Sequence, residues 1–315
     1  MNGNVTKGIY LALITAFISG IAIFVNKFAV TAIQPPIVFI AVKNAGVGLL
    51  ILAILLAGRK WKLVKKLNKR ELIYLFCIGI IGGSIPFYLY FTGLTQIPAI
   101  NAAIIHKTLV IWVAFMAIPL LKEKMSALQI FAVILLFGAN LLVGGFTGFT
   151  FLDGEFLILI ATVFWAIENI LAKKILPTVD PDIVTAARMG LGSLILLGAA
   201  AITAPEALAK SLSLTSTQWF FMIITIATLL GYVMSWYRAL KYAPATTVTS
   251  VLVASTLVTN ILSAIFITHA WTMLMGIQAV LMILGVSLFW LASKNTKIKL
   301  THLSFPRRRA TPYNG

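Results

Sequence analysis

Residues 8–27 read GIYLALITAFISGIAIFVNK, and residues 154–173 read GEFLILIATVFWAIENILAK. Each stretch is about 20 residues long, enough to cross the ~30 Å hydrocarbon core of a membrane as a helix. The two align without a gap at an offset of 146 residues. The identical positions are Gly8, Leu11, Leu13, Ile14, Ile21 and Lys27 against Gly154, Leu157, Leu159, Ile160, Ile167 and Lys173. Because a glycine and a lysine are among them, apolar composition alone does not explain the match.

The same offset continues through the following segments. Pro35, Ile37, Val38, Ala41 and Gly46 align with Pro181, Ile183, Val184, Ala187 and Gly192, and Leu94, Pro98 and Ala99 align with Leu240, Pro244 and Ala245. One fixed offset over so long a distance indicates an internal duplication.

The composition is that of an integral membrane protein. Of the 315 residues, 60% are hydrophobic and 10% are charged, and the mean hydropathy is +1.01. Soluble domains average about 25% charged residues. Apolar stretches long enough to span a bilayer recur along the chain. We place ten spans at 8–30, 37–57, 72–92, 98–120, 126–146, 153–174, 182–203, 217–238, 245–268 and 272–292.

The predicted fold is an all-α integral membrane protein with ten transmembrane helices in two inverted five-helix repeats. Each repeat holds an odd number of spans, so the two halves cross the membrane in opposite directions. We divide the chain into a first repeat at 1–148, a second repeat at 149–293 and a basic cytoplasmic tail at 294–315. Inverted repeats are typical of alternating-access carriers, whose substrate site lies near the membrane midplane.

The net charge of +17 is explained by membrane topology. A basic cluster lies between the second and third spans, formed by Arg59, Lys60, Lys62, Lys65, Lys66, Lys69 and Arg70. With that loop in the cytoplasm, most other basic residues also fall inside, and Lys27 and Lys210 fall outside. The positive-inside rule then places both termini in the cytoplasm of a multi-pass inner-membrane protein. Nucleic acid is not an expected partner.

Several function classes lack their motifs. The single cysteine, Cys77, cannot form an internal disulfide, and no Cys/His cluster has the spacing of a metal site. No GxxxxGK[ST] motif is present for ATP, so no cofactor is expected. A lipid-acting enzyme needs a nucleophile, an acid/base pair or a metal cluster, and none is recognisable. The expected partners are a small-molecule substrate and the bilayer, and a homodimer is compatible with the sequence.

Short motifs add a family resemblance. A Glu-Lys-Met-Ser turn at Glu123 to Ser126 opens the fifth span, Tyr-Ala-Pro-Ala-Thr at Tyr242 to Thr246 precedes the ninth, and Gly138 and Gly285 lie in the fifth and tenth. With the repeat arrangement, these resemble the EamA family of the drug/metabolite transporter superfamily. The resemblance implies export or exchange of small metabolites, with spans 1–4 and 6–9 around a cavity and spans 5 and 10 as scaffold. At the repeat offset, Glu123 corresponds to His269.

Ionisable residues inside spans are costly and mark candidate functional sites. We expect Glu168, about 8 Å deep, to meet Arg188 across the hairpin of the sixth and seventh spans, as a gate, a proton-coupling site or a structural ion pair. His106 is grouped with Glu168 as a gating or proton-coupling candidate. Lys43, about 9 Å deep, corresponds to Arg188 within one residue. The two cations flank a central cavity or, alternatively, extend to the headgroups.

Lys107 lies about 15 Å deep, too central to reach the headgroups, and is the principal candidate for binding an anionic group of the substrate. On the matching span, polar residues share one helical face: Thr249, Thr256, Asn260 and Ser263. They line the same cavity or bond neighbouring helices together. The candidate aromatic walls are Tyr88, Trp112, Trp165 and Trp236.

The sequence predicts a secondary transporter of a small anionic or zwitterionic metabolite, such as an amino acid or carboxylate, working as an exporter or exchanger by alternating access. The alternative is a broad-specificity exporter of hydrophobic or cationic compounds. A channel is a further alternative from another functional class, since polar stripes can also line a pore.

Overall fold

The computed structural model describes residues 3–97, 99–142, 148–149 and 153–295, and every regular element in them is a helix. In these residues nine helices are long and apolar enough to cross a membrane, and Ala127–Leu141 is a shorter apolar helix. The predicted all-α fold is therefore confirmed. The predicted tail at 294–315 lies almost wholly outside the described residues.

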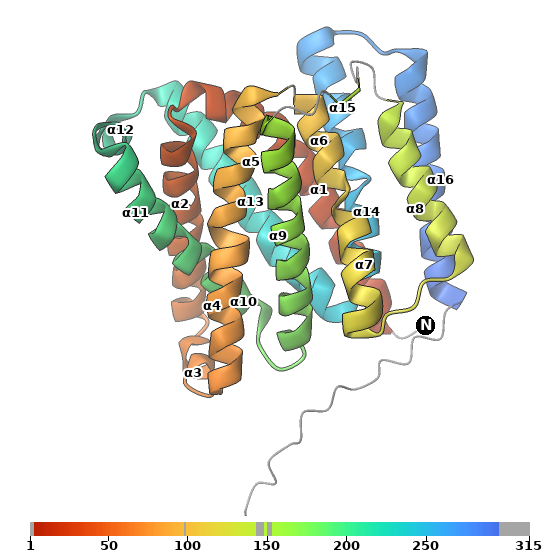
Figure 1. The fold of residues 1–315 in the computed structure, drawn as a ribbon, viewed down its shortest axis with the longest axis horizontal. Helices are drawn as coiled ribbons and strands as arrows, with labels where there is room; N and C mark the ends of the chain where they lie inside the picture. The colour runs from red at the N-terminus through yellow and green to blue at the C-terminus, as the bar shows by residue number, and fades with distance from the viewer. Residues whose placement is uncertain (1–2, 98, 143–147, 150–152, 296–315) are drawn as a thin grey trace, which may run out of the picture.

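The helices follow the predicted order (Figure 1). The first half contains α1 (Gly3–Ala32), α2 (Pro36–Ala57), α4 (Lys69–Gly83) with α5 (Ile85–Gln96), α6 (Ala99–Lys107) with α7 (Leu109–Leu121), and α8 (Ala127–Leu141). The second contains α9 (Asp153–Ile175), α10 (Pro181–Ala186) with η1 (Ala187–Leu191) and α11 (Gly192–Thr203), α13 (Ser216–Tyr242), α14 (Ala245–Leu252) with α15 (Ser255–Ser263) and η3 (Ala264–Thr268), and α16 (Met273–Asn295). Connections carry α3 (Trp61–Val64), α12 (Pro205–Lys210) and η2 (Ser211–Ser213).

Helix starts follow from local sequence. Asn68 and Glu71 form a reciprocal capping box at α4, and Ser126 with Gln129 does the same at α8. Such boxes satisfy backbone N–H groups that have no partner inside the helix. Pro36 starts α2 at a position where a missing N–H costs nothing.

The helix contacts obey the inverted repeat. Helix α1 of the first half packs along α13 of the second half. Its counterpart in the second half, α9, packs along α4 and α5 of the first half. The helices α8 and α16, which correspond to each other, pack together, and so do α2 and α11. Figure 1 shows α8 and α16 side by side at one edge of the bundle, apart from α2 and α11.

Both halves use the same glycine contact. A Cβ at Gly8 would lie 2.6 Å from Cβ of Ala243, and a Cβ at Gly154 would lie 2.8 Å from Cγ2 of Ile97. Each of the two contacting residues, Ala243 and Ile97, follows the end of a helix, and they are related by the 146-residue offset. The identity of Gly8 and Gly154 therefore reflects a close approach of helices that only glycine permits.

Several of the crossing segments are interrupted within the bundle. The fourth segment breaks at Thr108 and the ninth at Val253 and Ala254, again one repeat apart. The seventh segment contains the π-helical turn η1, and such turns occur frequently at functional sites. These irregularities lie next to Lys107 and at Arg188.

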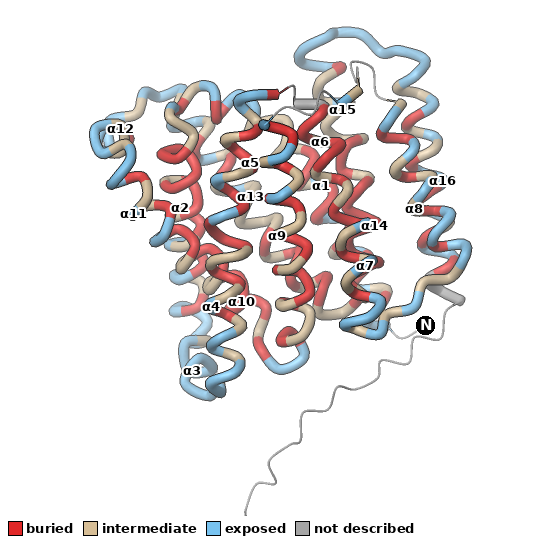
Figure 2. Tube along the Cα trace, viewed as in Figure 1, coloured by how far each residue is buried: buried red, intermediate tan, exposed pale blue. Residues whose placement is uncertain are grey.

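The two ends of the bundle differ in charge. One end carries α3, the start of α1 and the ends of α7, α9 and α13 (Figure 1), and we call it the basic end. The opposite end carries α12 and the connection from α1 to α2. Figure 2 shows buried positions on the inward faces of the helices, while α8 and α16 also carry exposed positions along their length. The apolar surface they expose suits a lipid environment.

We expect Gly8→Ala and Gly154→Ala each to destabilise the protein by about 1–3 kcal/mol, because the added methyl group overpacks a closed helix contact. Thermal unfolding in detergent measures the effect. Gly138→Ala and Gly198→Ala are matched controls, since a Cβ at either position meets nothing within 4 Å. Equal destabilisation by all four substitutions would contradict the assignment.

Candidate functional site

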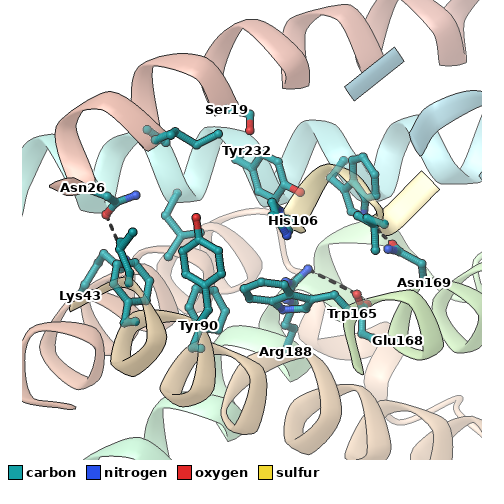
Figure 3. A pocket seen from close by; sticks show the side chains of 18 of the residues that line it. Ser19, Asn26, Lys43, Tyr90, His106, Trp165, Glu168, Asn169, Arg188 and Tyr232 are labelled. Carbon is teal, nitrogen blue, oxygen red and sulfur yellow. Dashed lines mark hydrogen bonds and ion pairs between the residues drawn. The ribbon is translucent and has the colours of Figure 1, made fainter. Parts of the chain in front are cut away.

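A cavity of about 110 Å³ lies at the centre of the bundle, between helices of both halves. Its walls come from α1, α2, α5, α6, α7, α9, η1 and α13. Lys27, near the end of α1 at the opposite end of the bundle, lines it and is exposed, so the cavity reaches towards that end. Figure 3 shows a cation, Lys43, on one side of this space and the Arg188–Glu168 pair on the other.

Lys43 is buried on α2, with 1% of its surface exposed. Its Nζ donates a hydrogen bond to Oδ1 of Asn26, 3.2 Å away, and lies 4.6 Å and 4.2 Å from the ring centroids of Phe39 and Phe91. Aromatic faces stabilise a cation without neutralising it. No carboxylate of the described residues lies within ion-pair distance of Lys43.

On the other side of the cavity, Glu168 and Arg188 meet as expected. Arg188 Nη1 lies 3.5 Å from Glu168 Oε2, and the Tyr237 hydroxyl donates to Glu168 Oε1 over 2.6 Å. Arg188 Nε donates to the carbonyl of Gly82 over 3.2 Å. A Cβ at Gly82 would lie 2.4 Å from Cγ of Glu168, so glycine there leaves room for the carboxylate side chain.

Aromatic side chains and one histidine lie between the two charged sides (Figure 3). The ring of His106 lies 5.0 Å from that of Trp165 and 5.5 Å from that of Tyr90. Its Nδ1 is buried and has no hydrogen-bond partner among the described residues. Trp236 Nε1 donates to Oδ1 of Asn169 over 2.8 Å, which holds α13 against α9 beside the cavity.

The charges on the cavity wall do not balance. Lys27, Lys43 and Arg188 are cationic, whereas Glu168 supplies the only carboxylate among the described lining residues. The excess positive charge in a site of restricted water access favours an anionic group on whatever binds there.

The cavity brings together part of the set chosen from the sequence. Lys43, Arg188, Trp165, Trp236, Glu168 and His106 all line it. The others lie away from its lining: Lys107, Thr249, Thr256, Asn260, Ser263, Tyr88 and Trp112.

Those outer residues have other partners. Lys107 is buried and donates to the hydroxyl of Ser255 on α15, which joins the fourth and ninth crossing segments. Thr249 donates to a carbonyl of its own helix, and Thr256 donates to the carbonyl of Val253 in the break before α15. Asn260 donates to Oε1 of Gln278 on α16 over 2.7 Å. Tyr88 points outward, with 48% of its surface exposed.

Sequence reasoning did not select several residues that line the cavity, among them Asn26, Tyr90 and Tyr232. It also did not select Tyr237, which lies behind the lining and contacts Glu168 and Arg188. Asn26 carried a signal, because it is an amide within an apolar span directly before Lys27. The tyrosines had none, since aromatic residues are frequent throughout this chain and at membrane interfaces generally.

At the basic end, two charged side chains hold the linker between α13 and α14. Glu123 accepts hydrogen bonds from the backbone N–H groups of Ala245 and Thr246, at 2.7 and 3.0 Å. Lys173 donates to the carbonyl oxygens of Leu240 and Ala243. Glu123 belongs to the first half and α14 to the second, so this contact joins the halves on the side of the cavity facing the basic end.

Among the described residues, the repeat-related side chains form no such hydrogen bonds at the opposite end. Lys27, the counterpart of Lys173, is exposed and lines the cavity, and His269, the counterpart of Glu123, is exposed after η3. The contacts at the two ends are therefore unequal.

These features define a class: a polytopic helical membrane protein with inverted repeats and a central cavity lined by charged and aromatic side chains, the architecture of membrane carriers. A family model described as "EamA-like transporter family" matches residues 6–145 and again 152–291. The chain belongs to this transporter family, as its motifs and repeat had indicated.

A solved crystal structure has the same fold, with a TM-score of 0.72 at 14% sequence identity, covering 92% of this chain and 98% of the other. At that identity the likeness concerns the fold alone. No curated protein matches the chain.

Substitution of either member of the Glu168–Arg188 pair is expected to destabilise the protein by about 3–5 kcal/mol, because the partner is left buried without its counter-charge. The measurement is thermal unfolding of Glu168→Gln, Arg188→Met and the double variant. The double variant should lose much less stability than the sum of the two single losses. Additive losses would show that the two groups do not interact.

Proposed function

We propose that this protein is a secondary active transporter of a small anionic or zwitterionic metabolite, exporting or exchanging it by alternating access. The observation that carries the proposal is Lys43, a buried cation on the cavity wall with no carboxylate partner among the described residues. A substrate carboxylate or phosphate would complete its coordination, with Asn26 holding the ammonium in place.

Arg188 supports the same reading from the other side. Its guanidinium is shared between Glu168, Tyr237 and the carbonyl of Gly82, so it orients the far wall of the cavity. In a zwitterion such as an amino acid, the anionic group would face Lys43 and the amino group would face Glu168. Each charge of the substrate would then face a side chain of opposite charge.

The basic end is proposed to be cytoplasmic. It carries α3 with its lysines and most other basic residues of the described connections, which is the charge distribution of inside loops. The inner membrane and cytoplasmic termini follow from this assignment. The cavity then reaches towards the outside, and the contacts of Glu168, Glu123 and Lys173 close the inner side.

Alternating access requires these inner contacts to break when the cavity opens to the cytoplasm. Glu123 joins the first half to the start of α14 in the second half, with two backbone hydrogen bonds and a third from the Thr246 hydroxyl over 2.7 Å. Because no matching contact forms among the described residues at the other end, Glu123 favours the state in which the inner side is closed.

A second candidate function is export of hydrophobic or cationic compounds. The aromatic wall favours it: Tyr232 and Trp236 stack with ring centroids 5.8 Å apart, and Tyr90 and Trp165 face the same cavity. Such faces bind apolar groups and cations. Lys43 would not contribute to the affinity for such a substrate.

Lys43→Met is expected to weaken binding of an anionic or zwitterionic substrate about 10- to 100-fold, the usual loss for a hydrogen bond to a charged group. The assay screens amino acids, carboxylates, sugar phosphates, amines and hydrophobic cations by ligand-induced thermal stabilisation of the purified protein.

The control for this prediction is Lys107→Met, which also removes a buried lysine but lies off the cavity wall. It should keep the ligand response. Loss of response in Lys107→Met with retention in Lys43→Met would instead place the anion at Lys107. Stabilisation by hydrophobic cations alone, equal in both variants, would support the second candidate.

Glu123→Gln is expected to open the inner side more often, because an amide binds the backbone N–H groups less strongly than a carboxylate does. A cysteine placed at Ala172, which is fully buried on α9, reports this opening in a Cys77→Ala background. Its maleimide labelling should accelerate several-fold in Glu123→Gln. Glu206→Gln at the opposite end is the charge-matched control, and equal acceleration there would exclude a specific role for Glu123.

A further inference from the structure

The connection between α2 and α4 presents an unusual surface at the basic end. Every residue from Trp61 to Lys66 is exposed. We call this set the α3 patch: Trp61, Lys62, Leu63, Val64, Lys65 and Lys66. It combines three lysines with three large apolar side chains.

The lysines of the patch lack counter-charges in the described part of the protein. No carboxylate of the described residues is within ion-pair distance of Lys62, Lys65 or Lys66. The acid next in sequence, Glu71, is already bonded to the backbone N–H of Asn68 and to the hydroxyl of Thr178. The charge of the patch is therefore available to an external anion.

Lys60, just before the patch, is paired by contrast. Its Nζ lies 3.0 Å from Asp180 and 2.6 Å from Asp182, and Asp182 also meets Arg238 at 2.6 Å. Burial alone would lower the pKa of Lys60, but the two carboxylates outweigh it and hold the pKa above its ordinary value. This lysine stays charged and ties the patch to the start of α10.

The apolar members distinguish a lipid surface from a soluble anion. Trp61, Leu63 and Val64 are 41%, 39% and 40% exposed, although they neighbour charged residues. The ammonium groups of Lys62 and Lys65 lie 6.0 and 5.1 Å from the Trp61 ring. A tryptophan beside lysines is typical of the membrane interface, where the ring enters the headgroup region and cations meet phosphates.

The position of the patch in the fold also agrees with contact to a lipid surface. The flanking helices α2 and α4 expose apolar side chains directly before and after it, among them Leu52, Leu56, Ile73 and Phe76. These surfaces suit the hydrocarbon of the bilayer, so the patch lies where that apolar wall ends. A soluble acidic partner would bind the lysines but would not account for the exposed apolar side chains of Trp61 and Leu63 at the edge of the bilayer.

We propose that the α3 patch is a binding site for anionic phospholipid headgroups. The phosphates contact Lys62, Lys65 and Lys66 while Trp61 enters the interface. Lys60 links the occupied patch through Asp180 and Asp182 to α10, whose continuation η1 carries Arg188. Bound anionic lipid thereby stabilises the closed basic end of the protein.

The test compares binding of phosphatidylglycerol and phosphatidylcholine to the delipidated full chain, by native mass spectrometry and by thermal unfolding in mixed micelles. Phosphatidylglycerol is expected to bind more tightly and raise the unfolding temperature by at least about 3 °C. The triple variant Lys62→Gln, Lys65→Gln, Lys66→Gln should lose roughly two orders of magnitude in affinity for it. Phosphatidylcholine should bind both proteins alike.

The matched control is the triple variant Lys124→Gln, Lys174→Gln, Lys241→Gln, which removes the same charge from other positions at the same end. It should keep the affinity of the wild type. An equal loss in both variants, or full retention in the α3 variant, would overturn the proposal. So would free glycerol 3-phosphate competing as well as the lipid, since the site would then bind a soluble anion.

A second measurement does not depend on the triple variant. Brominated phosphatidylglycerol should quench tryptophan fluorescence more in the wild type than in Trp61→Phe, and the difference should decrease at high salt because exposed charges are screened. Identical quenching in the two proteins would show that Trp61 does not enter the lipid interface.

Discussion

The close approach of helices at Gly8 and Gly154 is the constraint on which the rest of the structure depends. In each half the start of one long helix lies against the linker that follows another, at distances only glycine allows. Helices in a bilayer associate through such close packing, since lipid offers no hydrophobic driving force between them. Because the contact is repeated with inverted sense, α1 lies on α13 and α9 lies on α4 and α5, and the cavity is enclosed between these two pairs.

Within that frame, the polar contacts gather towards the basic end, which we propose to be the closed side. Glu168, Arg188 and Tyr237 form one layer of contacts, and Glu123 with Lys173 forms another beyond it at the basic end. Buried charges of this kind are tolerated because each has a partner. Lys43 is different, since an amide and aromatic rings surround it in place of a carboxylate. The same packing thus produces a closed side and a cation on the cavity wall, the two requirements of the proposed transport cycle.

Sequence reasoning reached the Glu168–Arg188 pair because both residues lie at similar depths on consecutive helices, where geometry leaves few alternatives. It also placed Lys43 opposite Arg188 through the repeat. It could not separate Lys43 from Lys107, because depth along a helix does not tell which way the side chain points in the bundle. The structure turns Lys107 towards Ser255, and the break at Thr108 lies directly beside it. The tyrosines around the cavity were indistinguishable in sequence from those at membrane interfaces.

By itself the sequence determined the membrane environment, the ten crossings, the inverted repeat and the family. These depend on composition, periodicity and chain length, which act locally along each helix and need no knowledge of its neighbours. Only the tertiary structure decided which polar residues share the cavity, which are satisfied by another helix, and at which end of the bundle the polar contacts between helices gather. Such choices depend on the rotation of each helix about its axis and on its irregular turns, such as η1, and these are set by packing between segments more than a hundred residues apart.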